Sequence, residues 1–424
     1  MTPSKEHLLL LVSTTGYTGA AFRDAAAKLG VAVIVGSDRC HVLADKWPED
    51  GMLTLDFRDP ARAVEQIVSA AASRTIRAIL PSSELTATIA ARASARLGLP
   101  HNAPGGAAAA GNKALMRARL AAAGVRSPAA QTFAIAEDPR RTAERVAFPC
   151  VLKPLLLSAS RGVIRADDPP SFVAAWRRIA AILALPELLA RDPIEGARIL
   201  VEPFVPGVEV AVEGLLSAGD LRVLAIFDKP DPLDGPYFEE TIYVTPSRLD
   251  AEAQRAIAAT TAAAARALGL REGPLHAELR INAEGPWVIE VAARSIGGLC
   301  GRALRFGVAM TLEELLVRHA MGLGAESEAG GGEREGAASG VMMIPTPRAG
   351  ILEQIDGVDA AKRVRGIDDV SVRSLGSRVA PPPDGDAYLG FIFARGASPE
   401  LVEGALREAH SLLVVRIAPL LPSP

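Results

Sequence analysis

Two glutamates occupy matching places in two short strand-like runs, "HAELRI" and "PWVIEVA". A turn centred on Glu284 is equally far from both, so it places Glu278 directly opposite Glu290 on one face of a hairpin. Opposed side chains of a hairpin have Cβ atoms about 4.5–5.5 Å apart, where like charges destabilise the pair. A divalent cation bound by both carboxylates removes this repulsion, and Mg2+ prefers oxygen ligands. The spacing therefore predicts a magnesium site.

Other arrangements of the same hairpin stay open. A register shifted by one residue leaves one glutamate in solvent, and Arg280 or Arg294 could neutralise the pair instead of a metal. General acid–base catalysis is a further option. It usually depends on one buried carboxyl group with a raised pKa rather than on two opposed ones.

Cationic and small polar residues upstream are typical of a phosphate site. Lys153 ends the apolar run "FPCVL", and a buried ammonium group is costly unless it meets an anion. Lys113, in "GNKALMR", is a second cation near an expected helix start. The loop "SASRGV" adds hydroxyls, a guanidinium group and flexible backbone amides, from Ser158, Ser160, Arg161 and Gly162. Each residue alone could be a solvated surface residue, so their order along the chain carries the prediction.

The elements that must position these residues begin with an expected parallel sheet in the first hundred residues. The apolar runs "HLLLLV", "VAVIVG" and "AILP" alternate with helical patterns, as strands joined by helices do. The turn "STTGYTG" lacks the GxGxxG spacing of a dinucleotide site, so NAD is not indicated. Proline- and glycine-rich turns then mark a boundary near residue 100.

The later part of the chain divides at a segment poor in bulky apolar residues. The stretch "AESEAGGGEREGAASG" is dense in glycine and glutamate and is expected to be a linker, over 326–340. The residues after it, 341–424, are expected to form a small α+β unit.

Composition excludes several classes of protein. The 424 residues are 49% hydrophobic and 22% charged with a formal net charge of −3, which favours a globular protein and not a nucleic-acid binder. No run reaches the roughly 20 apolar residues of a membrane span. The three cysteines lack CxxC or metal-type spacing, so reduced thiols and a cytoplasmic location are expected.

The order of these features resembles the ATP-grasp superfamily, and most closely its carboxylate–amine ligase branch of L-amino acid ligases and carnosine-synthase-like enzymes. The strings "NKALMRARLAAAGVRSP", "FPCVLKPLLLSASRGV", "ILVEPFVPGVEVAVEG", "DKPDPLDGPYFEETIYVTPS" and "HAELRINAEGPWVIEVAARSIGG" carry the resemblance over roughly residues 100–310. It implies an α/β ATP-grasp fold with a Rossmann-like N-terminal sheet domain, a central ATP-binding lid plus catalytic sheet, and a small C-terminal α+β lobe. The implied boundaries are 1–100 for the N-terminal domain, 101–325 for the ATP-grasp domain and 341–424 for the C-terminal lobe. The lid lies at about 131–203 within the ATP-grasp domain.

The resemblance also implies residue roles for ATP and Mg2+, for which Mn2+ could stand in. Lys113 and Lys153 contact the phosphates, and the loop from Ser158 to Gly162 closes over them. Glu278 and Glu290 ligate the metal. The backbone of the hinge from Glu202 through Phe204 to Val205 binds the adenine, and Glu209 binds the ribose. Arg294 stabilises the transferred phosphoryl group, and Lys153 and Arg161 are also catalytic.

One position departs from the family pattern and bears on the metal. Many members carry asparagine two residues after the second glutamate, where this chain has Ala292. Mg2+ keeps waters and substrate phosphates among its ligands, so the site stays plausible with fewer protein ligands. The number of bound ions is left open.

The implied activity is an ADP-forming ligation in which a carboxylate is activated as an acyl phosphate and coupled to an amine, with amino acids as substrates. Substrate contacts are expected from Tyr237, Glu239, Glu240, His276 and Gly298, and Gly298 predicts a roomy pocket. The expected partners are small molecules, and a homodimer is compatible with the family. The alternatives are a carboxylase or purine-biosynthesis-type enzyme that activates bicarbonate or formate, and an inactive ATP-binding protein.

Overall fold

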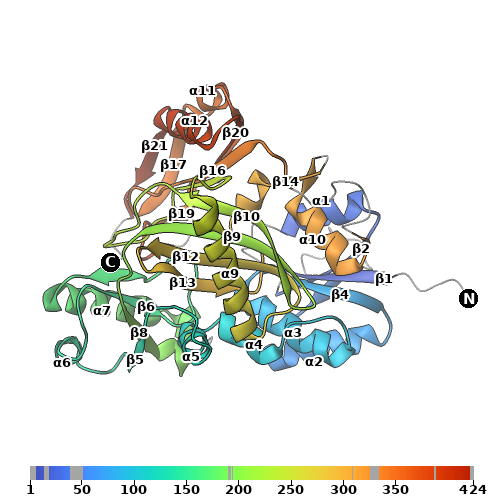
Figure 1. Cartoon of the computed structure of the whole chain (residues 1–424), viewed down its shortest axis with the longest axis horizontal. Coiled ribbons are helices and arrows are strands. Elements are labelled where there is room, and N and C mark those ends of the chain that lie inside the picture. Colours follow the sequence, from blue (N-terminus) through green and yellow to red (C-terminus); the bar gives the residue numbers. More distant parts are fainter. Residues whose placement is uncertain are drawn as a thin grey trace, which may run out of the picture.

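The computed structural model describes residues 6–13, 19–38, 51–189, 192, 194–307, 309–324, 334–385 and 388–420. The described strands form five sheets, and a four-stranded antiparallel sheet projects at the lower left of Figure 1. Most of the predicted linker, Gly16 of the first turn and Cys40 lie outside the described residues. No helix in the described ranges has the length and apolar character that a bilayer crossing requires.

The N-terminal unit is a parallel sheet of order β3-β2-β1-β4, as the alternating pattern predicted. The central strand β1 is apolar at every buried position because both faces are covered. Its elements are β1 (Glu6–Leu11), α1 (Gly19–Lys28), β2 (Ala32–Ser37), β3 (Met52–Thr54), α2 (Pro60–Ala71), β4 (Thr75–Pro81) and α3 (Glu84–Leu97).

Two short helices lead from this unit into a four-stranded antiparallel sheet of order β5-β8-β6-β7, which we call the lid sheet. Helix α7 packs Phe172 and Trp176 against this sheet, so the lid sheet has a core of its own. The elements are α4 (Pro104–Ala110), α5 (Lys113–Ala122), β5 (Gln131–Ala134), α6 (Pro139–Ala143), β6 (Cys150–Pro154), β7 (Ile164–Ala166), α7 (Pro169–Leu183), α8 (Pro186–Leu189) and β8 (Arg198–Pro203).

An eight-stranded central sheet of order β13-β12-β9-β10-β11-β16-β20-β18 forms the largest layer. Alternate residues of β9 explain its two covered faces: Val210 and Val212 pack toward α9, whereas Ala211 packs toward α10. Figure 1 shows α9 lying across one face. The elements are β9 (Val208–Ser217), β10 (Asp220–Lys229), β11 (Ile242–Thr245), α9 (Ala251–Leu268), β12 (Gly273–Asn282), β13 (Gly285–Ala292) and α10 (Leu312–Met321).

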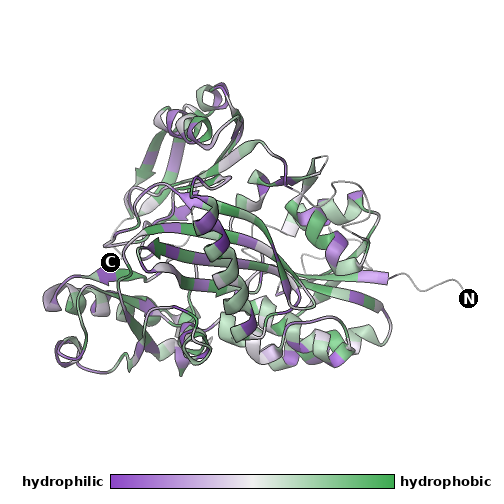
Figure 2. Cartoon of the chain, in the orientation of Figure 1, coloured by the Kyte–Doolittle hydropathy of each residue, from purple (hydrophilic) through white to green (hydrophobic). Residues whose placement is uncertain are grey.

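The C-terminal unit adds three strands to this central sheet and a separate sheet of order β19-β17-β21. Green apolar segments in Figure 2 follow the strands and the covered sides of the helices, in agreement with the buried clusters. The predicted α/β class is confirmed, and the domain boundaries stay predictions. The elements are β16 (Ala338–Ile344), β17 (Gly350–Asp356), α11 (Val358–Lys362), β18 (Ile367–Val372), β19 (Arg378–Val379), β20 (Gly390–Gly396), α12 (Pro399–Ser411) and β21 (Val414–Ala418).

Candidate active site

A cavity between the lid sheet and the central sheet collects most of the predicted site residues. Side chains reach it from α5, from the loop after β6, from β8, and from the central strands β9, β12 and β13. The predicted residues that line it are Lys113, Lys153, Ser158, Ser160, Glu202, Phe204, Val205, Glu209, Glu240, Glu278 and Glu290. Residues far apart in the sequence therefore meet at one place.

The two glutamates of the hairpin are paired as predicted, but the turn and the register that pair them differ from the prediction. Glu278 of β12 lies opposite Glu290 of β13. The turn is only two residues long, since Asn282 pairs with Gly285, and this register alone would place Ile289 opposite Glu278. An irregularity between Glu278 and Leu279 shifts the register by one residue and restores the pair.

Lys113 and Lys153 both approach this cavity. Asn112 caps α5 by accepting hydrogen bonds from Ala114 and Leu115, which fixes Lys113 at the first helical position. The Lys113 ammonium group donates to the Leu157 carbonyl over 2.6 Å and lies 3.6 Å from Glu290. It thereby places a positive charge beside one of the opposed carboxylates.

Lys153 is held by a buried ion-pair network that the sequence did not indicate. Its ammonium group lies 2.5 Å from Glu202, which also accepts a hydrogen bond of 2.9 Å from Arg117. Burial opposes the charge on Glu202, but Arg117 and Lys153 outweigh it and lower the pKa of this carboxyl. Arg117 also donates to the Ile289 carbonyl, so it joins the lid sheet to β13. Arg117 lies one helical turn after Lys113, and this spacing is the feature of the sequence that could have indicated its place near the site.

The loop from Ser158 to Gly162, predicted as a flap, is built of consecutive turns, in which the Arg161 amide donates to the Ser158 carbonyl and the Val163 amide to the Ser160 carbonyl. Ala159 and Ser160 both have φ of 54°, a left-handed conformation that is uncommon outside glycine. Ser158 and Ser160 line the cavity. The Gly162 amide donates to the Pro383 carbonyl over 2.9 Å, and Arg161 is not among the cavity-lining residues.

Two backbone groups of the hinge after β8 form hydrogen bonds within the protein. The Phe204 amide donates to the Pro149 carbonyl, and the Val205 carbonyl accepts a hydrogen bond from Arg280. Arg165 and Arg280 lie over the Phe204 ring, with guanidinium carbons 4.1 and 4.9 Å from its centroid. The hinge is therefore fixed in place next to the cavity.

Charged residues alternate in register across β9 and β12. Arg280 pairs with Glu209, Glu278 with the small residue Ala211, and His276 with Glu213. The Arg280 guanidinium lies 2.8 Å from Glu209. The register thus sets acids beside bases along one face of the sheet.

Lys229 of β10 is the cation at the centre of this face. Its ammonium group lies 2.8 Å from Glu209 and 3.1 Å from Glu278, and it also donates to Glu240. Burial opposes its charge, but these three carboxylates outweigh it and hold the pKa of Lys229 well above its usual range. The three carboxylates have oxygens within 4.8 Å of one another, a spacing that suits a metal, and the Lys229 ammonium group contacts all three.

Glu240 is a partly buried acid of the cavity whose pKa is raised. It accepts hydrogen bonds from Lys229 and, over 2.6 Å, from the Tyr243 hydroxyl. Burial raises its pKa to about 7, against the opposing effect of Lys229. Glu239 accepts a hydrogen bond from the Thr346 amide, and burial raises its pKa too. Only Glu240 of the two lines the cavity between the sheets.

His276 lies between two carboxylates on the same face. Its ring nitrogens are 3.4 Å from Glu213 and 3.8 Å from Glu278. Burial opposes protonation, but Glu213 and Glu278 outweigh it and raise the pKa of His276 to about 9. Glu213, which sequence reasoning missed, also accepts a hydrogen bond from the Ile296 amide.

Arg294 is positioned by a residue of the N-terminal unit. Its Nε lies 2.9 Å from Glu84, the first residue of α3, and a second nitrogen bonds the same carboxylate. Burial opposes the charge on Arg294, but Glu84 and Glu290 outweigh it and raise the pKa of the guanidinium group. Glu84 lies about two hundred residues upstream, so no local pattern pointed to it.

The two remaining predicted substrate residues have different surroundings. Gly298 has φ of 61°, and a Cβ atom there would lie 3.0 Å from the Phe391 ring. The space next to Gly298 is therefore bounded by the C-terminal unit. Tyr237 is 45% exposed, and its backbone forms an isolated bridge with Ile164 of the lid sheet.

Comparisons with known proteins agree with this arrangement. Models of the ATP-grasp N-terminal domain, the ATP-grasp domain and the L-amino acid ligase C-terminal domain 2 match residues 23–101, 146–303 and 342–418. The solved L-amino acid ligase from Bacillus licheniformis superposes with a TM-score of 0.81 and 25% identity, over 98% of this chain and 100% of that one. The chain belongs to the ATP-grasp superfamily, and it is similar to the carboxylate–amine ligase branch of that superfamily.

Two curated members of this ATP-grasp branch illustrate the likeness. Alanine–anticapsin ligase of Bacillus subtilis is 31% identical over 287 residues, or 64% of this chain and 60% of the relative. Dapdiamide A synthase of Enterobacter agglomerans is 29% identical over 238 residues, or 55% of this chain and 54% of the relative. The chain thus spans about 60% of the length of the first relative. The family resemblance predicted from sequence is confirmed.

Proposed function

We propose that the chain is an ATP-dependent ligase that joins the carboxylate of one amino acid to the amine of another. A carboxylate oxygen attacks the γ-phosphorus of ATP, the bond to the β-phosphate oxygen breaks, and ADP leaves. The amine nitrogen then attacks the acyl carbon, phosphate leaves with the bonding electrons, and the amine loses a proton. Catalysis of this kind depends on positioning and charge neutralisation rather than on a side-chain nucleophile.

The observation that supports this proposal most is the opposed pair Glu278 and Glu290 beside Lys113 in a cavity shared by two sheets. Mg2+ bound by the two carboxylates would supply positive charge to the phosphates. Lys113 and Lys153 provide fixed positive charges at the same place, and Ser158 and Ser160 can donate hydroxyl hydrogen bonds from the flap.

The amino acid specificity is proposed from the acids near Lys229 and from Arg294. Glu240 offers a carboxylate for a substrate ammonium group, and Arg294 offers a guanidinium group for the developing charge of the acyl phosphate. The roomy pocket predicted at Gly298 is not proposed, because a Cβ atom there would lie only 3.0 Å from the Phe391 ring. Four further residues do not line the cavity but remain proposed contacts of the substrates or ATP: Tyr237, Glu239, His276 and Arg161.

The test is an ADP-release screen of amino-acid pairs with ATP and Mg2+. Glu290→Gln removes a charged metal ligand while keeping its shape, and we expect it to lower turnover at least about 100-fold. Glu284→Gln, an exposed change in the turn of the same hairpin, is the matched control and should retain activity. Full activity of Glu290→Gln would overturn the metal assignment.

The same screen separates the rival functions. ADP release that requires bicarbonate or formate and no amino acid would identify a carboxylase-type enzyme. ATP binding without release of ADP for any carboxylate would identify an inactive nucleotide-binding protein. Mass spectrometry of the reaction mixture should detect a product equal in mass to the two amino acids minus water.

A further inference from the structure

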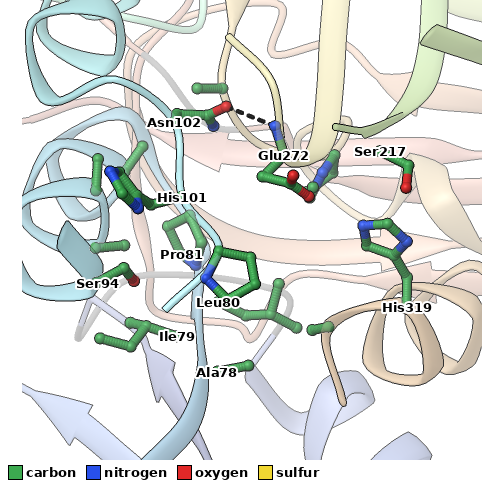
Figure 3. Close-up of a pocket in the computed structure, with 18 of the residues that line it drawn as sticks. Ala78, Ile79, Leu80, Pro81, Ser94, His101, Asn102, Ser217, Glu272 and His319 are labelled. Carbon is green, nitrogen blue, oxygen red and sulfur yellow. Dashed lines mark hydrogen bonds between the residues drawn. The ribbon is translucent and has the colours of Figure 1, made fainter. Parts of the chain in front are cut away.

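A second cavity of about 430 Å3 lies between the N-terminal sheet and the central sheet (Figure 3). It is bounded by β4, by α3, by the last turn of α10, and by the start of β12 at Gly273 and Pro274. Arg280, which contacts the hinge, lies near the other end of β12. The volume is within the range of small-molecule sites, roughly 300–1,000 Å3.

The floor of this cavity is apolar and is made of small residues. Ala87, Ala90 and Ala91 share one face of α3, because residues three or four apart in a helix are neighbours. Leu80 of β4 and Pro274 of β12 complete the floor. Alanine side chains leave the space open and favour an aliphatic group as its occupant.

Polar side chains surround this apolar floor. Figure 3 shows His101 at one side of the cavity, and Glu272, Ser217 and His319 at the other. One oxygen of Glu272 accepts a hydrogen bond of 3.0 Å from the Ala218 amide. A carboxylate has a second oxygen and further lone pairs, so Glu272 can also accept from a ligand.

The histidine at the opposite side has a defined tautomer. Its Nδ1 lies 2.7 Å from the Leu99 carbonyl, which only accepts hydrogen bonds, so Nδ1 carries the proton. Nε2 of His101 then accepts a hydrogen bond when the ring is neutral and donates one when the ring is protonated. His101 can therefore meet a carboxylate in its protonated form.

The backbone of β4 offers a further pair of groups. Strand β4 is at the edge of its sheet, next to β1 only. The Ser82 amide donates to Leu11 of β1, so by alternation the N–H and C=O of Ile79 point to the open edge. Ile79 and Pro81 line the cavity, and Pro81 has no N–H. An edge N–H and C=O at one residue suit a short peptide or an amino acid.

We propose that this cavity binds a small zwitterion with an aliphatic side chain, either a free amino acid or a dipeptide. The ammonium group meets Glu272, the carboxylate meets His101 at the opposite side, and the aliphatic group covers the alanine face of α3. This site is separate from the proposed ATP site and its occupation requires neither ATP nor Mg2+. The inference therefore goes beyond the proposed function and does not depend on it.

The experiment uses photo-leucine, a diazirine analogue of leucine, with the full chain and without ATP or Mg2+. Irradiation should give crosslinks within residues 78–102, 217–218, 272–274 or 318–320, located by mass spectrometry of peptides. Unlabelled L-leucine should compete. Leucinamide, which lacks the carboxylate, and 4-methylpentanoate, which lacks the ammonium group, should compete at least tenfold less well.

Two variants address the site directly. Glu272→Gln removes the acid and Ala91→Leu fills the floor, and each should lower crosslinking in these segments at least tenfold. Glu252→Gln, an exposed change on α9, is the matched control. Circular dichroism establishes that each variant is folded. Glu272 is partly exposed, so Glu272→Gln still tests the proposal if Ala91→Leu does not fold.

Crosslinks confined to Glu84, Arg294 and Gly298 would overturn the proposal, because they would place leucine at the proposed active site alone. Equal crosslinking of wild type and both folded variants, or no crosslink in the four segments, would also overturn it. Loss of ligase activity in the Glu290→Gln variant has no bearing on these outcomes.

Discussion

Lys229 is surrounded by the carboxylates of Glu209, Glu240 and Glu278. Glu278 lies beside both Lys229 and His276. Burial opposes its ionisation, but these two bases outweigh it and hold the pKa of Glu278 well below its usual range. Glu240 shares Lys229 but has no histidine next to it, and its pKa is raised. Neighbouring acids with such different environments are suited to different roles, a metal ligand and a proton-dependent contact.

The raised pKa of Glu240 predicts a pH-dependent stability. Between about pH 4.5 and about pH 7 the folded chain holds this proton and the unfolded chain does not, so the free energy of unfolding falls as pH rises. Glu240→Gln removes this contribution, and the fall between pH 5 and pH 8 should shrink by roughly 2 kcal/mol. Urea denaturation of wild type and variant at both pH values measures it.

Glu252→Gln is the control for this comparison, because Glu252 is exposed in the first turn of α9. Its fall in stability between the two pH values should match that of wild type. An identical fall in Glu240→Gln would show that Glu240 ionises normally in the folded chain.

At this scale the sequence predicted what local geometry determines. Glu278 and Glu290 belong to one hairpin, so the prediction of a turn centred on Glu284 gave the correct pair, although the structure reaches it through a two-residue turn and a register shift of one residue. Lys229 and Glu209 also pair within one hairpin, because only Ala218 and Gly219 separate β9 from β10, so the same reasoning applied to this contact. Arg280 belongs to β12, which follows β10, β11 and α9 in the chain, and no spacing indicates its register with Glu209. The same reason hid the pair of Glu84 and Arg294.

Among the elements, the lid sheet is attached to the C-terminal unit at two points. The Gly162 amide donates to the Pro383 carbonyl, and Arg178 of α7 forms an ion pair with Asp384. The two contacts connect the loop after β6 and helix α7 to a segment that lies more than two hundred residues later in the chain. The family resemblance implied the lid, but a contact between distant segments has no sequence period to reveal it.

The ion pair at this attachment predicts a change in flap motion. Arg178→Met removes it, and partly exposed pairs contribute up to about 1 kcal/mol, so flap amides should exchange up to about fivefold faster. Hydrogen–deuterium exchange of the peptide containing Gly162 provides the measurement. Arg177→Met, exposed on the same helix, should leave exchange unchanged. Equal exchange in wild type and Arg178→Met would show that this ion pair does not restrain the flap.

At the scale of the whole molecule, the central sheet does not stop where the C-terminal unit begins. Strand β16 pairs with all four residues of β11, whereas β10 pairs with β11 through Asp228 and Val244. Strands β20 and β18 continue the sheet beyond β16. The sequence predicted a separate α+β lobe here, since the strands themselves are readable but their partners are not.

Truncation of the chain before β16 should therefore also disrupt the folding of the part that remains. A chain ending at residue 334 exposes the edge of β11 and the apolar side chains Ile242 and Val244, which belong to a buried cluster. We expect aggregation, or a monomer that lacks cooperative unfolding, in size-exclusion and thermal-melting experiments. A stable monomer of native-like melting temperature would show that β16 is dispensable.

This continuity also constrains how such chains can be recombined. A family model isolates residues 342–418 as a unit of sequence, yet its strands β16 and β20 complete a sheet begun by β9 to β11. A chimaera that imports this segment from a relative must also reproduce the pairing of Tyr243 with Val341 and its neighbours. Exchange of C-terminal units between relatives should succeed only where the crossover lies before β11, so that both sides of the seam come from one parent.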